Sequence, residues 1–271
     1  MDSATKIRLV VSDVDGTLVD SQKRLPPGFS KAVRKLREHG VRFVIASGRQ
    51  YYNVLKTFDC VRDDILVLPD NGAMLIENDE AYYTNRMSAE DVADILRAVE
   101  QIPTAHPLLE GVRALYLRPG SDFYEHEVAR YYERRVVAPD AFEQAASDTI
   151  CKVAIFDDVS SAQNIAPVVA RFSDHLTVTL SGDNWLDIMN KGVDKGSGLR
   201  IILDHLGLMP DECMAFGDYD NDIQMLKICG ESYAMANATD AVKAVCRHLA
   251  PSNEEAGVMQ VLRREFPFLN D

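Results

Sequence analysis

The segment Ile7-Arg-Leu-Val-Val-Ser-Asp-Val-Asp-Gly-Thr17 decides the fold class of this sequence. Its first six residues form a short apolar run rich in β-branched side chains, which is typical of a buried strand. Two carboxylates, Asp13 and Asp15, follow directly, with the turn-forming Gly16 behind them. Ligands of open parallel sheets bind beyond the carboxyl ends of the strands, so the two aspartates stand where a ligand site is expected. Taken alone, they would also fit a solvated acidic turn.

Strands and helices alternate on both sides of the chain's middle third. Apolar residues at helical spacing predict helices over 28–39 and 195–205, while short apolar runs predict strands over 41–46, 65–69 and 213–216. Strand–helix–strand alternation indicates a parallel sheet with helices on its faces. We therefore expect an α/β protein with a Rossmann-like, doubly wound parallel-sheet core.

The pattern changes in the middle of the chain. Asn78-Asp79 between two short apolar runs predicts a hairpin, and Ser88 begins a helix that belongs to a segment of mixed strands and helices. We expect a core formed by residues 1–81 and 189–271, interrupted by an inserted α+β domain over residues 82–188.

Composition restricts the function and the location. The 271 residues include 29 Lys and Arg against 42 Asp and Glu, a net charge of −13 that argues against nucleic-acid or membrane-surface partners. Five cysteines without a CxxC motif fit free thiols in a reducing compartment. The sequence shows neither a signal peptide nor an apolar run long enough to span a membrane, so we expect a cytoplasmic protein.

Two further motifs suit a phosphate group. Ser47-Gly48-Arg49 follows the second predicted strand and combines a hydroxyl, a glycine that lets backbone N–H groups approach a ligand, and a helix start. Lys195, in the first turn of a predicted helix, is a compact positive charge suited to a phosphoryl oxygen. Each motif alone would equally fit an ordinary turn and a solvated surface lysine.

The fourth motif is Gly217-Asp-Tyr-Asp-Asn-Asp222, at the end of the strand predicted over 213–216. Three acids within five residues repel one another unless a cation compensates, and a hard oxygen-binding ion such as Mg²⁺ is the natural partner. A calcium-binding EF-hand is excluded, because neither this motif nor the one at Asp13 has the required Gly and Glu at positions 6 and 12.

The order of these four motifs resembles the haloacid dehalogenase superfamily of phosphohydrolases, in particular its Cof-type branch with a C2-type inserted cap. Three further stretches, Pro69–Ala73, Asp187–Gly196 and Ala234–Ala238, also resemble that branch. The resemblance covers the whole chain and implies that residues 82–188 form a cap that sets substrate choice.

The resemblance also implies roles for individual residues. Asp13 would attack phosphorus and form an aspartyl-phosphate, while Asp15, kept protonated, would donate a proton to the leaving oxygen and then activate water. Mg²⁺ would be held by Asp13, the backbone carbonyl of Asp15, and Asp218. The remaining residues would contact the phosphoryl group (Thr17, Ser47, Gly48, Lys195 and Asn221) or hold the metal site or the lysine in place (Asp222).

The expected function is that of a Mg²⁺-dependent phosphohydrolase acting on phosphate monoesters of small metabolites, either sugar phosphates or phosphorylated cofactors. The expected partner is a small phosphorylated metabolite, bound by a monomer or a small homo-oligomer. Two alternatives stay open. A phosphotransferase or phosphomutase would use the same aspartyl-phosphate, and a non-catalytic sensor would bind a phosphorylated ligand without cleaving it. The presence of both Asp13 and Asp15 argues against the sensor.

Overall fold

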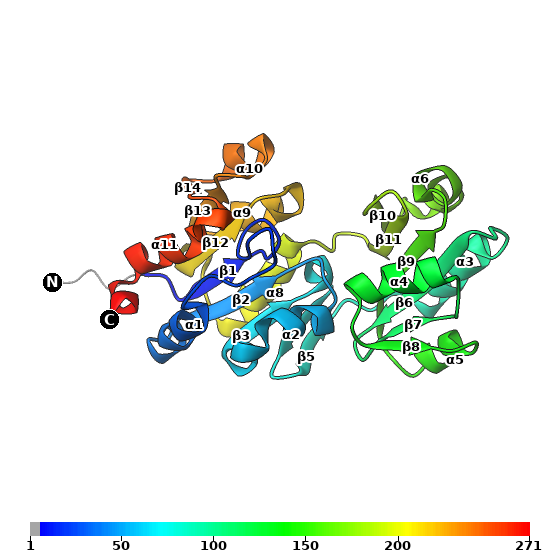
Figure 1. Ribbon diagram of the computed structural model, residues 1–271, viewed down its shortest axis with the longest axis horizontal. Helices are drawn as coiled ribbons and strands as arrows, with labels where there is room; N and C mark the ends of the chain where they lie inside the picture. The colour runs from blue at the N-terminus through cyan, green and yellow to red at the C-terminus, as the bar shows by residue number, and fades with distance from the viewer. Residues whose placement is uncertain (1–5) are drawn as a thin grey trace. The chain divides into compact units, whose positions relative to one another are not determined.

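The computed structural model describes residues 6–271 and divides into two compact units (Figure 1). The first unit contains the chain up to Tyr82 together with Asp194–Asp271, and the second contains Tyr83–Val193. Among the described residues, no helix is both long and apolar enough to cross a membrane.

An eight-stranded sheet forms the centre of the first unit, in the order β14-β13-β12-β1-β2-β3-β4-β5. Strands β14 to β3 run parallel, and β4 pairs antiparallel with β3. The strands are β1 (Leu9–Ser12), β2 (Arg42–Ala46), β3 (Ile65–Leu68), β4 (Met74–Glu77), β5 (Glu80–Thr84), β12 (Cys213–Gly217), β13 (Glu231–Met235) and β14 (His248–Ala250). Because β1 is central and the chain winds outward from it in both directions, the predicted doubly wound α/β core is confirmed.

Helices cover both faces of this sheet. Figure 1 shows α1 and α2 in front of β2 and β3, and α8 behind them. The helices of the first unit are α1 (Phe29–Glu38), α2 (Tyr51–Phe58), α8 (Lys195–Leu206), α9 (Ile223–Ile228), α10 (Asp240–Val245) and α11 (Gly257–Glu265). In α1 the buried side chains recur at helical spacing, at Phe29, Ala32, Val33 and Leu36. One face of the helix therefore packs on the sheet, and the opposite face is exposed to solvent.

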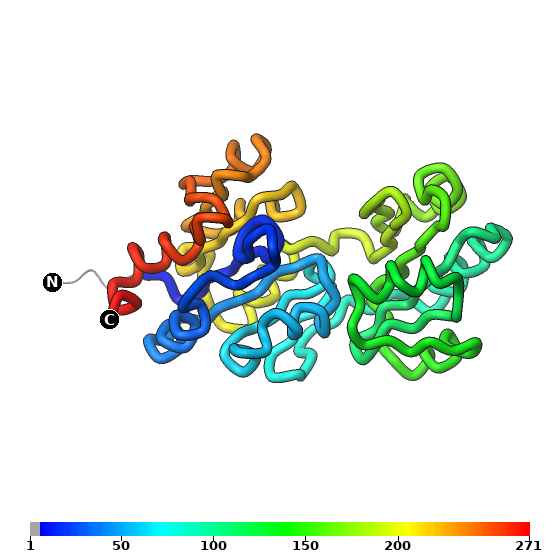
Figure 2. Tube along the Cα trace, viewed as in Figure 1, coloured from blue at the N-terminus to red at the C-terminus, as the bar shows by residue number. Residues whose placement is uncertain are grey.

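The register of the central strands places the motifs of the sequence at one edge of the sheet. Ser12, the last residue of β1, lies beside Phe216 of β12 and beside Ile45 of β2. Figure 2 shows this neighbourhood, in which the blue start of the chain runs next to the yellow segment some two hundred residues later. The residues that follow β1, β2 and β12 therefore emerge side by side.

The second unit has a six-stranded sheet in the order β10-β11-β9-β6-β7-β8. All neighbouring pairs are antiparallel except β7–β8. Its strands are β6 (Ala105–Gly111), β7 (Leu115–Leu117), β8 (Arg135–Val137), β9 (Ile150–Asp157), β10 (Leu176–Leu180) and β11 (Trp185–Asn190). Its helices are α3 (Ala89–Val99), α4 (Asp122–Tyr131), α5 (Ala141–Ala145), α6 (Ser161–Asn164) and α7 (Ala166–Val169).

Each face of this second sheet has its own apolar core. Val153 and Ile155 of β9 pack with residues of α3, α5 and α7, while the alternate residues Ala154 and Phe156 pack with Tyr124 and Val128 of α4. The side-chain alternation of a strand thus supplies both cores.

The boundary expected after residue 188 is wrong by five residues. Strand β11 continues to Asn190, which lies opposite Leu176 of β10, and the unit extends to Val193. The physical reason is pairing: Met189 and Asn190, the last residues of β11, pair with Thr177 and Leu176 of β10, so they belong to that sheet.

We predict that residues 83–193, expressed alone, fold cooperatively, because this stretch is continuous and carries two apolar cores of its own. Circular dichroism during thermal unfolding measures this directly. A broad, non-cooperative transition would show instead that the segment depends on the remainder of the chain.

Candidate active site

A buried lysine lies at the centre of the predicted site. The side chain of Lys195 is 0% exposed, and its Nζ lies 2.5 Å from Oδ1 of Asp13 and 2.6 Å from Oδ1 of Asp222. Lys195 is the first residue of α8, whose start is fixed by a capping box between Asp194 and Ser197. The alternative of a solvated surface lysine is therefore wrong.

Asp222 holds the lysine and the turn that follows β12. One of its oxygens accepts a hydrogen bond from the ammonium group of Lys195. The other accepts hydrogen bonds from the backbone N–H of Asp218, at 3.0 Å, and from that of Tyr219, at 3.2 Å. Both oxygens of this fully buried carboxylate are thus engaged. This geometry supports the expectation that Asp222 orients its neighbours.

Asp218 approaches the segment that follows β1. Its Oδ1 accepts a hydrogen bond of 2.7 Å from the hydroxyl of Thr17. Gly16, with φ of +81°, makes this approach possible, because a Cβ atom at that position would lie 2.3 Å from Oδ2 of Asp218. The sequence motif requires glycine here for both its backbone conformation and its lack of a side chain.

Three acidic side chains, Asp13, Asp218 and Asp222, cluster at Lys195, whose single positive charge contacts two of them. Burial raises the pKa of Asp13 to about 7 against the opposing attraction of Lys195, and burial also raises the pKa of Asp218 in spite of the hydrogen bond from Thr17. Burial lowers the pKa of Lys195, but the charges of Asp13 and Asp222 outweigh it and keep the amine protonated. Added positive charge would stabilise the ionised carboxylates.

The donor set suits a hard divalent cation. Oxygens of Asp13, Asp218 and Asp222 all lie within 4.8 Å of one another. Since both oxygens of Asp222 already accept hydrogen bonds, Asp13 and Asp218 are the carboxylates best able to bind a metal ion. Carboxylate oxygens are ligands that Mg²⁺ prefers.

Asn71 connects Ser47 and Gly48, the phosphate-binding candidates that follow β2, with the turn that follows β12. The Asn71 backbone N–H donates to the carbonyl of Ser47 at 2.9 Å, and its side-chain oxygen accepts a hydrogen bond of 2.9 Å from Asn221. Its side chain also lies against Gly48, where a Cβ atom would be 3.2 Å from the amide nitrogen. Ser47, Gly48 and Asn221 therefore lie together around Asn71.

Sequence reasoning missed Asn71 as a residue of the site. The available signal was the dipeptide Asn71-Gly72, because Asn71 has a φ of +51° and asparagine tolerates that left-handed conformation. The tight turn at Asn71 directs its amide toward Asn221.

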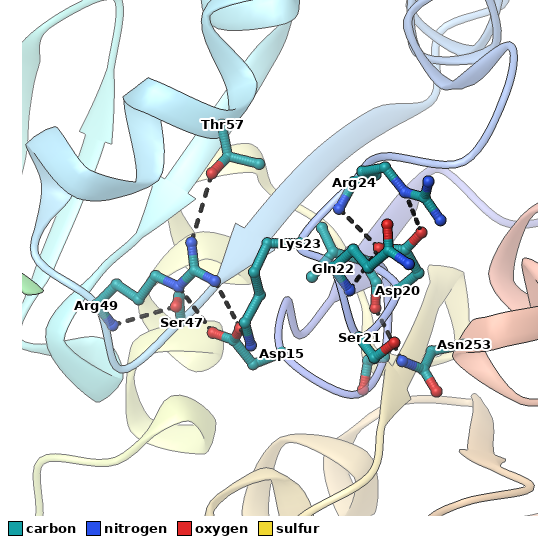
Figure 3. A network of polar contacts seen from close by, with 12 residues as sticks. Asp15, Asp20, Ser21, Gln22, Lys23, Arg24, Ser47, Arg49, Thr57 and Asn253 are labelled. Atoms are coloured by element: carbon teal, nitrogen blue, oxygen red, sulfur yellow. Dashed lines mark hydrogen bonds and ion pairs between the residues drawn. The ribbon is translucent and has the colours of Figure 1, made fainter. Parts of the chain in front are cut away.

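Asp15 lies in a different environment from Asp13. Its Oδ2 accepts a hydrogen bond of 2.7 Å from Nε of Arg49. Its Oδ1 accepts two hydrogen bonds of 2.5 Å, one from Nη2 of Arg49 and one from Nζ of Lys23 (Figure 3). Burial raises the pKa of Asp15, but the hydrogen bonds from Arg49 and Lys23 outweigh it and hold the pKa below its ordinary value. The expectation of a protonated Asp15 is wrong for this arrangement, because the two cations favour the ionised form.

Fold and site together define an α/β protein whose polar centre, at the ends of parallel strands, suits an anion beside a divalent cation. The sequence model of the haloacid dehalogenase-like hydrolases matches residues 10–262. The chain belongs to this family, which confirms the resemblance found in its motifs and makes the protein a hydrolase of the Cof type.

Relatives and solved structures agree with this assignment. The chain is 28% identical over 272 residues to a protein of Escherichia coli and 25% identical over 279 residues to one of Bacillus subtilis; each alignment covers 97% of this chain and 98% of the relative. Both relatives are named 5-amino-6-(5-phospho-D-ribitylamino)uracil phosphatase.

Two solved structures are similar over nearly their full length. SMU.1108c of Streptococcus mutans has a TM-score of 0.80 and 29% identity, with coverage of 98% of this chain and 100% of that one. A haloacid dehalogenase-like hydrolase of Bacteroides thetaiotaomicron has a TM-score of 0.84 and 25% identity, with coverage of 96% and 100%.

We predict that Lys195→Met lowers the free energy of unfolding by about 3–5 kcal/mol, because it leaves buried carboxylates without their cation. Denaturant unfolding measures the change. The control is Lys6→Met, since Lys6 pairs with Asp211 where both side chains are exposed, and its change should stay below about 1 kcal/mol. Equal effects of the two substitutions would contradict the account of Lys195.

Proposed function

We propose that this protein is a Mg²⁺-dependent phosphatase that cleaves phosphate monoesters of small metabolites through an aspartyl-phosphate on Asp13. The observation that carries the proposal is the buried contact of Asp13 with Lys195, next to Asp218, at the carboxyl ends of β1 and β12. Family membership and the phosphatase names of the relatives support the same class of reaction.

In the first step, a carboxylate oxygen of Asp13 attacks phosphorus, and the bond between phosphorus and the leaving oxygen breaks. Lys195 stabilises the charge on Asp13 and on the phosphoryl oxygens, and Thr17, Ser47, Gly48 and Asn221 position the phosphoryl group. Because Arg49 and Lys23 favour the ionised form of Asp15, this residue takes up a proton from solvent before the step and then gives it to the leaving oxygen.

In the second step, Asp15 accepts a proton from a water molecule, whose oxygen attacks phosphorus. The bond between Asp13 and phosphorus then breaks, and inorganic phosphate leaves. Mg²⁺, held by Asp13, Asp218 and the Asp15 carbonyl, would supply charge neutralisation at the phosphoryl oxygens.

The substrate classes that we propose are sugar phosphates and phosphorylated cofactors. The names of the E. coli and B. subtilis relatives make a phosphorylated ribitylaminouracil the first compound to test. We further propose that residues of the 83–193 unit select among these substrates, and that the protein works in the cytoplasm as a monomer or small homo-oligomer. The net charge of −13 supports a small-molecule partner in preference to nucleic acid.

We predict that Asp13→Asn lowers the rate of phosphate release by about a thousandfold or more, because the side-chain amide of asparagine is not a nucleophile. The protein should stay folded. The measurement is phosphate release from a panel of phosphomonoesters, with Mg²⁺ or with a chelator. Asp211→Asn, in an exposed ion pair, is the matched control with unchanged activity. A fully active Asp13→Asn protein would refute the role of Asp13, and an isomeric phosphate ester as the product would favour a mutase.

We also predict that Mg²⁺ raises the melting temperature of the wild-type protein by a few degrees, since an ion bound only to the folded state stabilises it. Asp218→Asn should remove most of this shift, because it replaces one of the two carboxylates best able to bind the ion. Calorimetry with Mg²⁺ and with EDTA gives the comparison, with Asp211→Asn as the control. If Asp218→Asn kept the full shift, the metal site would lie elsewhere.

A further inference from the structure

Arg49 and Lys23 hold the carboxylate of Asp15 in one orientation. The guanidinium of Arg49 binds both oxygens, through Nε to Oδ2 and Nη2 to Oδ1, and Lys23 adds a second contact to Oδ1. A planar guanidinium that contacts both oxygens fixes the plane of the carboxylate as well as its position. Neither Arg49 nor Lys23 has a role in the mechanism proposed above.

Arg49 is itself held on its other side. Its Nη1 lies 3.4 Å from the hydroxyl of Thr57 and 3.5 Å from the side-chain oxygen of Asn53, both on α2. Its backbone N–H donates to the hydroxyl of Ser47 at 3.1 Å. Figure 3 shows the guanidinium between Thr57 and Asp15. Helix α2 and the β2 end therefore fix the direction in which Arg49 points.

Lys23 is held by the loop that follows the first motif. The Asp20 carboxylate accepts hydrogen bonds from the backbone N–H groups of Gln22 and Arg24, each at 2.9 Å, and from Nε of Arg24 at 2.7 Å. These contacts close a turn in which Lys23 has a φ of +60°. The turn directs the lysine side chain toward Asp15 (Figure 3).

The contacts leave the two oxygens of Asp15 unequal. A carboxylate has about four lone-pair positions, two on each oxygen. Oδ1 accepts two cationic donors and Oδ2 accepts only one. A single acceptor position, on Oδ2, is therefore free of these contacts.

We infer that Arg49, assisted by Lys23, is a positioning residue that orients Asp15 so that Oδ2 is the atom that exchanges the proton. This inference rests on the proposed function. The proton on Oδ2 passes to the leaving oxygen as its bond to phosphorus breaks, and Oδ2 later accepts a proton from the attacking water. Arg49 acts through Asp15 and does not contact the substrate.

A double-mutant cycle tests this inference. Steady-state phosphate release would be measured for the wild type, Arg49→Gln, Asp15→Asn and the combination of both. We expect Arg49→Gln to lower kcat by about 10- to 100-fold, because a small misplacement of a reacting group has effects of that size. KM should change less than kcat, and in the Asp15→Asn background the same substitution should have almost no further effect.

Conservative and control variants complete the experiment. Arg49→Lys should recover only part of kcat, since lysine restores the charge without the two-point contact. Lys23→Gln should have a smaller effect than Arg49→Gln, because the side chain of Lys23 is 59% exposed against 21% for Arg49. Arg37→Gln and Lys6→Gln, which break ion pairs elsewhere on this unit, should leave kcat unchanged.

Each contrary result has a distinct meaning. A raised KM with unchanged kcat would show that Arg49 binds substrate directly, and multiplicative effects of Arg49→Gln and Asp15→Asn would show that the two residues act independently. Either result overturns the inference and leaves the proposed function intact. A folded wild-type protein that released no phosphate from any ester would overturn the proposed function and this inference with it. Arg49→Lys keeps the comparison decisive if Arg49→Gln folds poorly.

Discussion

The contact of one buried lysine with two buried carboxylates is the interaction on which the rest of the site depends. Lys195 joins the end of β1 through Asp13, the start of α8 through its own backbone, and the turn after β12 through Asp222. Burying three charges is costly, and apolar residues of similar volume would often be as stable or more so. Stability alone does not explain this arrangement, whereas the proposed function does, because it places a fixed positive charge beside the proposed nucleophile, Asp13.

The two aspartates of the first motif show how neighbouring positions acquire different chemistry. Asp13 is buried against Lys195, and its pKa is raised, whereas Asp15 is partly exposed and its pKa is lowered by Arg49 and Lys23. A nucleophile must keep its position, and a group that exchanges protons must present one oxygen to the reacting atoms. In the proposed mechanism, Lys195 meets the first requirement for Asp13, and the planar guanidinium of Arg49 meets the second for Asp15.

The sequence predicted the core, and it predicted that the residues of the four motifs lie near one another, because both follow from strand order. Once β1 pairs with β2 and β12, the residues after these strands meet, which brings Asp13, Ser47 and Asp218 to one edge. The contact of Arg49 with Asp15 was not predictable in this way, since it depends on side-chain rotamers and on the placement of α2. The end of the second unit was misplaced because Met189 and Asn190 continue the pairing of β11 with β10, which their side chains do not reveal.

In the proposed mechanism, Asp13 carries the phosphoryl group during turnover. The most direct measurement is mass spectrometry of peptides from protein that is mixed with substrate and Mg²⁺ and denatured in acid within milliseconds. We expect one added phosphoryl group on the peptide that contains Asp13, and none on that peptide from the Asp13→Asn protein. Phosphate release with no phosphorylated Asp13 at any quench time, or with the label on another residue, would contradict it.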